Sequence, residues 1–163
     1  MRRTAIVASL AALMATAAAA QTFIGVGRAI DGDTIKIRNV TIRLHGIDAP
    51  EGGQTCDDAK GQPYDCGDTA TKALVGLLDS TILRCETRGE DVYKRTLAVC
   101  YPLLWATSIN TTMVREGHAR AFVRYSRDYL VAESEARLAK RGMWQGAHIA
   151  PWEYRQALRE ASR

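Results

Sequence analysis

Histidine is scarce in this chain: its three histidines lie far apart, and its four cysteines include no Cys-x-x-Cys pair. Zinc-binding modules need cysteine or histidine ligands at short, regular spacings, so these absences argue against one. Internal repeats and a linker that would separate a second domain are also missing. The 163 residues are therefore expected to form one ordinary domain with its own hydrophobic core.

A long apolar run with the length of a membrane span is missing as well. Residues 1–20 combine two arginines near the start, a short alanine-rich apolar run and a final series of small residues. This layout is typical of a secretory signal peptide, with cleavage expected before Gln21. A membrane anchor is the alternative, but the run is short and no charged stop follows it. We expect no stable membrane anchor after cleavage.

The excess of positive charge is small once this leader is set aside. Removal of Arg2 and Arg3 lowers the formal net charge from +4 to +2. The distribution is nevertheless uneven, because residues 48–68 are acidic and residues 115–163 are rich in arginine. An acidic patch beside a basic surface suits a metal ion together with a polyanion better than it suits a polyanion alone.

The four cysteines all follow the leader, and an even number in an exported chain favours two disulfides. Three pairings are possible. Cys56 with Cys66 would close a short loop, and Cys85 with Cys100 would join two strands of one hairpin, so we favour that pairing. A metal–thiolate site is the alternative, against which the missing ligand spacing argues.

The stretch from residue 31 to residue 51 predicts a β-hairpin and its exit, DGDTIKIRNVTIRLHGIDAPE. Alternation places the apolar side chains of residues 35–37 and 42–44 on one face. Residues 38–39 can form a tight turn between these two arms. The chain then doubles back, so that acidic residues far apart in the sequence become neighbours.

These neighbours carry the chemistry that we expect. Asp33 and Asp48 are hard oxygen ligands of the kind that Ca²⁺ takes, with water and substrate oxygens completing the coordination. Glu51 is placed to act on a water molecule beside the metal. Arg43 points away from the core, where it is either a solvated residue or a donor to phosphate oxygens. We favour the second interpretation, because acidic clusters lie on both sides of it.

The remaining sequence predicts one strand before this hairpin, a second hairpin after it, and helices between and beyond them. Five strands, with helices after the third and the fifth, indicate an α+β protein that is mainly a small, closed OB-type barrel with about three appended helices. Periodicity leaves open which face of strand 93–101 points inward; if the disulfide of Cys100 forms in the core, Arg95 faces outward and shares the barrel exterior with Arg43. The expected strands are 22–30, 81–88 and 93–101, and the expected helices are 68–79, 104–116, 127–141 and a short one in 151–163.

Four motifs occur in order along the chain: DGDT, RLHGIDAPE, YKRTLAV and VREGHARA. Together they resemble the staphylococcal nuclease-like family, the thermonucleases, over residues 22–144. The resemblance implies a five-stranded OB barrel with three helices. It also implies a Ca²⁺-dependent phosphodiesterase that acts on DNA and RNA, cuts the bond to the 5′ oxygen and leaves 3′-phosphate ends.

The resemblance assigns roles position by position. Asp33 and Asp48 match the two calcium carboxylates, and Ala49 matches a position whose backbone carbonyl binds calcium, although the best-studied member has threonine there. Asp31 matches an acid near the metal. Glu51 matches the acid that activates or orients the attacking water.

Four further positions match residues that contact the substrate. Arg43 and Arg95 match the arginines that hold the phosphate and stabilise the transition state, while Tyr93 and Tyr125 match tyrosines that line the nucleotide site. The chain departs from the family pattern where valine replaces a lysine or a second tyrosine of that site, at Val92 and Val123.

We therefore predict a monomeric nuclease, periplasmic or secreted, that cleaves DNA and RNA, with single-stranded or frayed substrates favoured. Its domain is expected at residues 21–145, with residues 146–163 as a C-terminal extension. The alternative is a non-catalytic OB-fold nucleic-acid-binding protein, which would predict losses among Arg43, Glu51 and Arg95. A disulfide-stapled structural module is a third interpretation.

Overall fold

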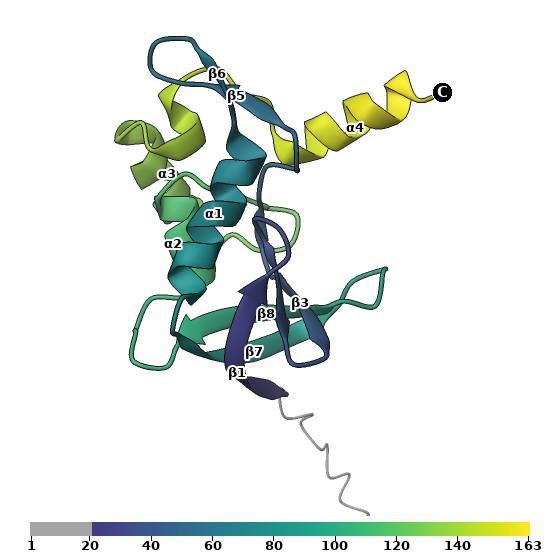
Figure 1. The fold of residues 1–163 in the computed structure, drawn as a ribbon, viewed down its shortest axis with the longest axis vertical. Helices are drawn as coiled ribbons and strands as arrows, with labels where there is room; N and C mark the ends of the chain where they lie inside the picture. The colour runs from purple at the N-terminus through teal and green to yellow at the C-terminus, as the bar shows by residue number, and fades with distance from the viewer. Residues whose placement is uncertain (1–20) are drawn as a thin grey trace, which may run out of the picture.

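A computed structural model describes residues 21–163, and the expected signal peptide, residues 1–20, lies outside the described residues. Five strands close into a barrel in the order β1-β2-β3-β8-β7, and the helices pack beside it (Figure 1). The predicted α+β fold with an OB-type barrel is confirmed. The barrel strands are β1 (Thr22–Ala29), β2 (Thr34–Ile37), β3 (Val40–Leu44), β7 (Ile82–Glu90) and β8 (Thr96–Pro102).

β2 and β3 form the first hairpin as predicted. They pair antiparallel, with Thr34 opposite Arg43. Arg38 begins the turn with a φ of +52°, in the left-handed region that residues with a Cβ seldom adopt. β3 then runs parallel to β8, which closes the barrel. The alternating apolar side chains of the hairpin all pack into the barrel core, namely Ile35, Ile37, Ile42 and Leu44.

β7 and β8 form the second hairpin, in which a disulfide joins Cys85 to Cys100 on the opposite strand. Both cysteines are fully buried, so this face of β8 points inward. The expected strand bounds of 81–88 and 93–101 are wrong at the turn, because β7 continues to Glu90 and the turn spans residues 91–95. Gly89, with a φ of +115°, lies at a register shift and marks a bulge within the hairpin.

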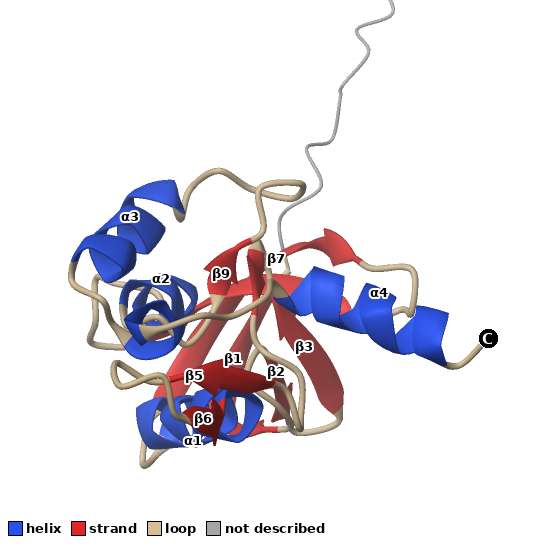
Figure 2. Ribbon diagram, turned by 90° about the horizontal axis from the view of Figure 1, so that it is seen from above, coloured by secondary structure: helices blue, strands red, loops and turns tan. Residues whose placement is uncertain are grey.

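Three helices gather on one side of the molecule and α4 lies apart from them (Figures 1 and 2). The predicted start of the first helix at Asp68 is wrong, because Asp65 accepts a hydrogen bond from the Asp68 amide at 2.7 Å and is the N-cap. The second helix begins only after Ser108, whose side chain caps it. The helices are α1 (Cys66–Leu78), α2 (Ile109–Arg115), α3 (Leu130–Leu138), α4 (Pro151–Ala161) and the short 3₁₀ helix η1 (Gly142–Gln145).

The loop that follows the first hairpin forms a small second core. β5 (Thr55–Asp57) pairs with β6 (Pro63–Asp65), and the predicted disulfide between Cys56 and Cys66 closes this ribbon. Met143 belongs to the same buried cluster as the two cysteines, so the loop is tied to the C-terminal part of the chain. Within residues 21–163 no helix is long and apolar enough to cross a membrane.

Candidate active site

A cavity of about 580 Å³ opens at the exit of the first hairpin. The hairpin exit, the turn between β7 and β8, residues 122–125 and α4 all contribute to its lining, although they are far apart in the sequence. The predicted metal ligands Asp33, Asp48 and Ala49 are buried next to this lining. The fold therefore gathers the predicted residues in one place. Those that line the cavity are Asp31, Arg43, Glu51, Tyr93, Arg95 and Tyr125.

Arg43 connects the cavity to the buried carboxylates. Its Nη1 donates to Asp33 Oδ1 at 2.6 Å, and its Nη2 donates to Asp48 Oδ1 at 2.5 Å. The register of β2 and β3 places it on the strand face opposite the core, and its side chain is only 17% exposed. A solvated outer-face arginine is therefore the wrong description of Arg43.

The turn at residues 31–33 brings Asp33 against Ala49. The Asp33 amide donates to Asp31 Oδ1 at 3.0 Å, and the Ala49 amide donates to Asp33 Oδ2 at 3.0 Å. A Cβ on Gly32 would lie 2.7 Å from the Ala49 Cβ, so the close approach of the two segments requires glycine. Both oxygens of Asp33 are therefore held, Oδ1 by Arg43 and Oδ2 by the Ala49 amide.

The electrostatic environment of Asp33 is unusual. Burial raises its pKa from 3.8 to about 7, although the neighbouring Arg43 guanidinium acts in the opposite direction. The carboxylates of Asp31 and Asp48 raise the pKa further. A second positive charge near these acids would favour the ionised form of Asp33.

Asp33 and Asp48 converge on one guanidinium group, and such paired, buried carboxylates fit a hard cation. No group of three or more histidine, cysteine, aspartate or glutamate side chains in residues 21–163 is arranged to hold a metal ion. These two acids would therefore need further oxygens from the backbone, water or substrate. Ca²⁺ accepts such mixed sets of six to eight oxygens.

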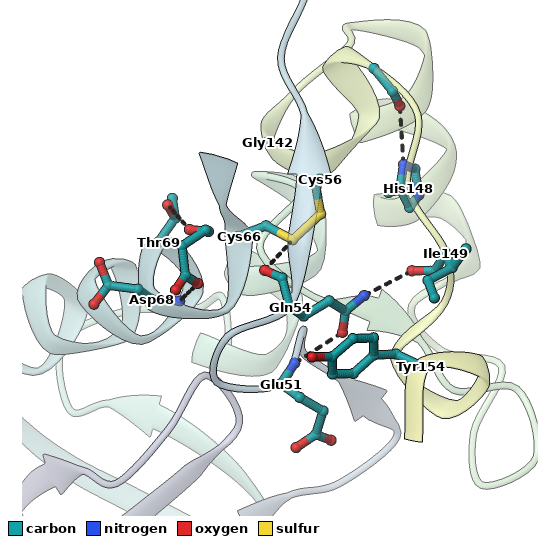
Figure 3. The surroundings of a disulfide bond; sticks show 12 residues. Glu51, Gln54, Cys56, Cys66, Asp68, Thr69, Gly142, His148, Ile149 and Tyr154 are labelled. Atoms are coloured by element: carbon teal, nitrogen blue, oxygen red, sulfur yellow. Dashed lines mark hydrogen bonds between the residues drawn. A yellow bond between two sulfur atoms is a disulfide. The ribbon is translucent and has the colours of Figure 1, made fainter. Parts of the chain in front are cut away.

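Glu51 lies at the rim of the cavity, where two backbone contacts hold it. Its amide donates to Gln54 Oε1 at 3.1 Å, and the buried Gln54 donates in turn to the Ile149 carbonyl at 3.0 Å (Figure 3). A Cβ on Gly67 would lie 1.8 Å from the Glu51 carbonyl oxygen, so α1 can begin here only with glycine. The Glu51 side chain itself is 38% exposed and free of the core.

Arg95 enters the cavity from the second hairpin. Its Nε donates to Asp91 Oδ2 at 2.7 Å, and its guanidinium lies 5.5 Å from the centre of the Tyr93 ring. Asp91 also accepts from the Arg95 amide, which shapes the turn. Arg43 and Arg95 thus share the cavity, Arg43 held by two carboxylates and Arg95 by one. The exposed rings of Tyr93 and Tyr125 lie on the lining around them.

Arg155 is the residue that the sequence analysis missed. Its Nη2 donates to Asp48 Oδ2 at 2.8 Å and its Nη1 to Asp48 Oδ1 at 3.1 Å, and Nη1 also forms an ion pair with Glu51. Burial alone would lower the pKa of Arg155, but these hydrogen bonds outweigh it and raise the pKa. Residues 146–163 therefore do more than extend the domain.

Stacked aromatic rings anchor α4 beside the site. Trp152 stacks on Phe122, with ring centres 5.4 Å apart and planes 19° apart, and its other partner is the Arg120 guanidinium at 4.9 Å. Trp152, Arg155 and Arg159 follow each other at helical spacing of three and four residues. This spacing is the signal that could have placed Arg155 on the anchored face of a helix.

Comparisons with known proteins identify the family to which the chain belongs. The family model described as staphylococcal nuclease homologue matches residues 41–146. The chain is 32% identical over 180 residues to the micrococcal nuclease of Shigella flexneri, covering 94% of this chain and 98% of the relative. It is 34% identical over 134 residues to an uncharacterized endonuclease of Haemophilus influenzae, covering 77% and 68%.

A third relative has a different kind of name. The succinoglycan biosynthesis protein ExoI of Rhizobium meliloti is 36% identical over 147 residues, which cover 85% of this chain and 74% of the relative. The family match ends at residue 146, so α4 lies beyond it.

Proposed function

Since the chain belongs to the staphylococcal nuclease family, we propose that it is an exported, Ca²⁺-dependent endonuclease that cleaves both DNA and RNA. Family membership makes it a metal-dependent nuclease that hydrolyses phosphodiester bonds in nucleic acid. The choice of ion, the range of substrates and the 3′-phosphate products are the parts that we propose. Two disulfides support export, because such bonds persist in oxidising compartments.

The convergence of Asp33 and Asp48 on Arg43 at the cavity carries the proposal. These two carboxylates, with the carbonyl of Ala49, would hold the metal ion. A bound ion would supply positive charge that polarises the phosphoryl group. Asp31 supports the turn that carries Asp33.

The other side chains would act on the phosphodiester and the water. Arg43 and Arg95 donate to phosphate oxygens and stabilise the charge that grows at phosphorus. Glu51 accepts a proton from the attacking water, whose oxygen bonds to phosphorus while the bond to the 5′ oxygen breaks. The 5′ oxygen leaves with the bonding electron pair and takes up a proton from water, so the products are a 3′-phosphate and a 5′-hydroxyl end.

The size of the cavity favours unpaired substrate. Its volume of about 580 Å³ is that of a small-molecule pocket, which admits one or two nucleotides more easily than a rigid duplex. Tyr93 and Tyr125 offer exposed rings on which bases can stack. We therefore propose single-stranded or frayed DNA and RNA as preferred substrates, bound by a monomer.

A cleavage assay tests the proposal. The mature chain, residues 21–163, is incubated with single-stranded DNA or RNA in Ca²⁺ or in a chelator. We expect fragments only in Ca²⁺, and a mobility shift of these fragments after 3′-phosphatase treatment. Substrate that is bound but left intact in Ca²⁺ would favour the non-catalytic binding protein. The presence of Arg43, Glu51 and Arg95 at one cavity argues against that alternative.

A further inference from the structure

The Arg155 guanidinium occupies the carboxylate oxygens that the proposed metal site needs. Asp48 is fully buried, and its Oδ1 accepts from both Arg43 and Arg155. Within residues 21–163 the one hydrogen-bond donor to Asp48 Oδ2 is Arg155, at 2.8 Å. A metal ion bound to Asp48 would therefore meet a positive charge at contact distance, and like charges repel strongly where solvent is scarce.

We propose that Arg155 is an intramolecular cation that competes with the divalent metal ion for Asp48 while it also pairs with Glu51, so that α4 sets the metal affinity of the enzyme. This inference rests on the proposed function, since it takes Asp48 to be a metal ligand. Arg155 acts through these two acids and is therefore a positioning residue. It balances their charge until the ion takes its place.

The anchoring of α4 determines how the metal ion replaces the Arg155 guanidinium at Asp48. The Trp152 ring stacks on Phe122 and contacts the Arg120 guanidinium, and the Tyr154 hydroxyl donates to the Gly53 carbonyl at 3.4 Å. The helix therefore stays docked while the long Arg155 side chain leaves the carboxylates. Since Arg155 lines the cavity, its released guanidinium remains within reach of substrate phosphate.

Arg159 offers a matched control on the same helix. It lines the same cavity one turn further on, and within residues 21–163 it makes no ion pair at 4 Å or less. Replacement of either arginine by methionine removes one positive charge and keeps an aliphatic side chain of similar length. Long-range electrostatics change in the same way in both variants, so a difference between them reports the contact with Asp48 and Glu51.

The test is calorimetric titration of the folded, substrate-free full mature chain with Ca²⁺. We expect Arg155→Met to bind Ca²⁺ on the order of 10-fold more tightly than wild type, a size typical of coupling between sites. Arg159→Met should change the affinity by less than about 3-fold, as expected for a screened surface charge. Circular dichroism checks that each variant is folded, and Arg155→Lys, which keeps the charge but loses the planar fork, should fall between wild type and Arg155→Met.

Two results would contradict this inference in different ways. If Ca²⁺ binding depends on Asp48, as shown by Asp48→Asn, but neither Arg155 variant binds more tightly than wild type, Arg155 is a structural ion-pair partner only. If Asp48→Asn binds Ca²⁺ as well as wild type does, the assigned metal site is wrong, and the proposed function and this inference are overturned together.

Discussion

The two sides of the cavity are built in different ways. On the hairpin side, strand register and core packing fix Asp33, Asp48 and Arg43, and both carboxylates are almost entirely buried. On the α4 side, Arg155 reaches Asp48 from 107 residues further along the chain, on a helix whose end projects from the body (Figure 1). The hairpin thus supplies groups that cannot move independently of the barrel. α4 supplies a charge whose position depends on a few contacts.

The largest expected effect comes from Glu51, where the two sides meet. Glu51→Gln keeps the shape and the hydrogen bond to Arg155 but removes the proton acceptor, so turnover should fall by about 10²- to 10⁴-fold. Thermal unfolding should change little, because the side chain is 38% exposed. Glu135→Gln, which alters a surface ion pair with Arg115, is the matched control and should keep its turnover. Unchanged turnover of Glu51→Gln on single-stranded DNA would contradict the assigned role.

The two arginines of the proposed phosphate site should matter equally for turnover but differently for stability. Arg43→Met leaves two buried carboxylates without their shared partner, and the free energy of unfolding should fall by about 3 kcal/mol. Arg95→Met removes a more exposed contact with Asp91 and should cost less than about 1 kcal/mol. Turnover should fall by about 10²-fold or more in both. Urea unfolding measures the loss of stability, and initial rates measure the loss of turnover. Equal losses of stability in the two variants would contradict the contrast between the buried Arg43 and the more exposed Arg95.

The sequence predicted the hairpin side well because its signals are local. Alternating Ile35, Ile37 and Ile42 and the turn after them define both the strands and the face on which Arg43 lies. The helix in residues 151–163 was expected, but the role of Arg155 was missed because its ion pairs join residues 104 to 107 positions apart, and no local pattern records such a distance.

The misplaced element boundaries have a similar cause. Asp65 and Asp68 are both suitable N-caps by residue type, and only the fold decides that Asp65 accepts the hydrogen bond. Gly89 is a turn former by type, yet in the hairpin it forms a bulge. A residue type defines what a position allows, while packing selects among the allowed structures.

Trp152→Ala tests whether α4 is held by few contacts. Loss of the stack on Phe122 and of the contact with Arg120 should lower the free energy of unfolding by about 2 kcal/mol. Hydrogen exchange should accelerate in α4 while β2 and β3 stay protected. Leu158→Ala, on the same helix at a half-exposed side chain, should change stability by less than about 0.5 kcal/mol. Equal acceleration in the hairpin and in α4 would show that the two sides open together.

The smallest expected effect is a loss of folding stability in acid. It arises from one partly buried histidine on each side of the cavity. Burial lowers the pKa of His45, at the hairpin exit, and that of His148, just before α4; nearby Arg88 and Arg120 lower these pKa values further. A lowered pKa means that the fold favours neutral imidazole. The stabilisation is therefore complete above about pH 6.5 and is lost as the pH falls below that value.

Comparison of two variants shows which side responds first. His148→Gln and His45→Gln should each flatten the decline in the urea midpoint between pH 8 and pH 5. Because α4 is attached by fewer contacts, wild-type α4 should also lose hydrogen-exchange protection at a higher pH than β2 and β3, and His148→Gln should delay this loss. A decline that is equally steep in His148→Gln and in wild type would show that protonation of His148 does not open the α4 side.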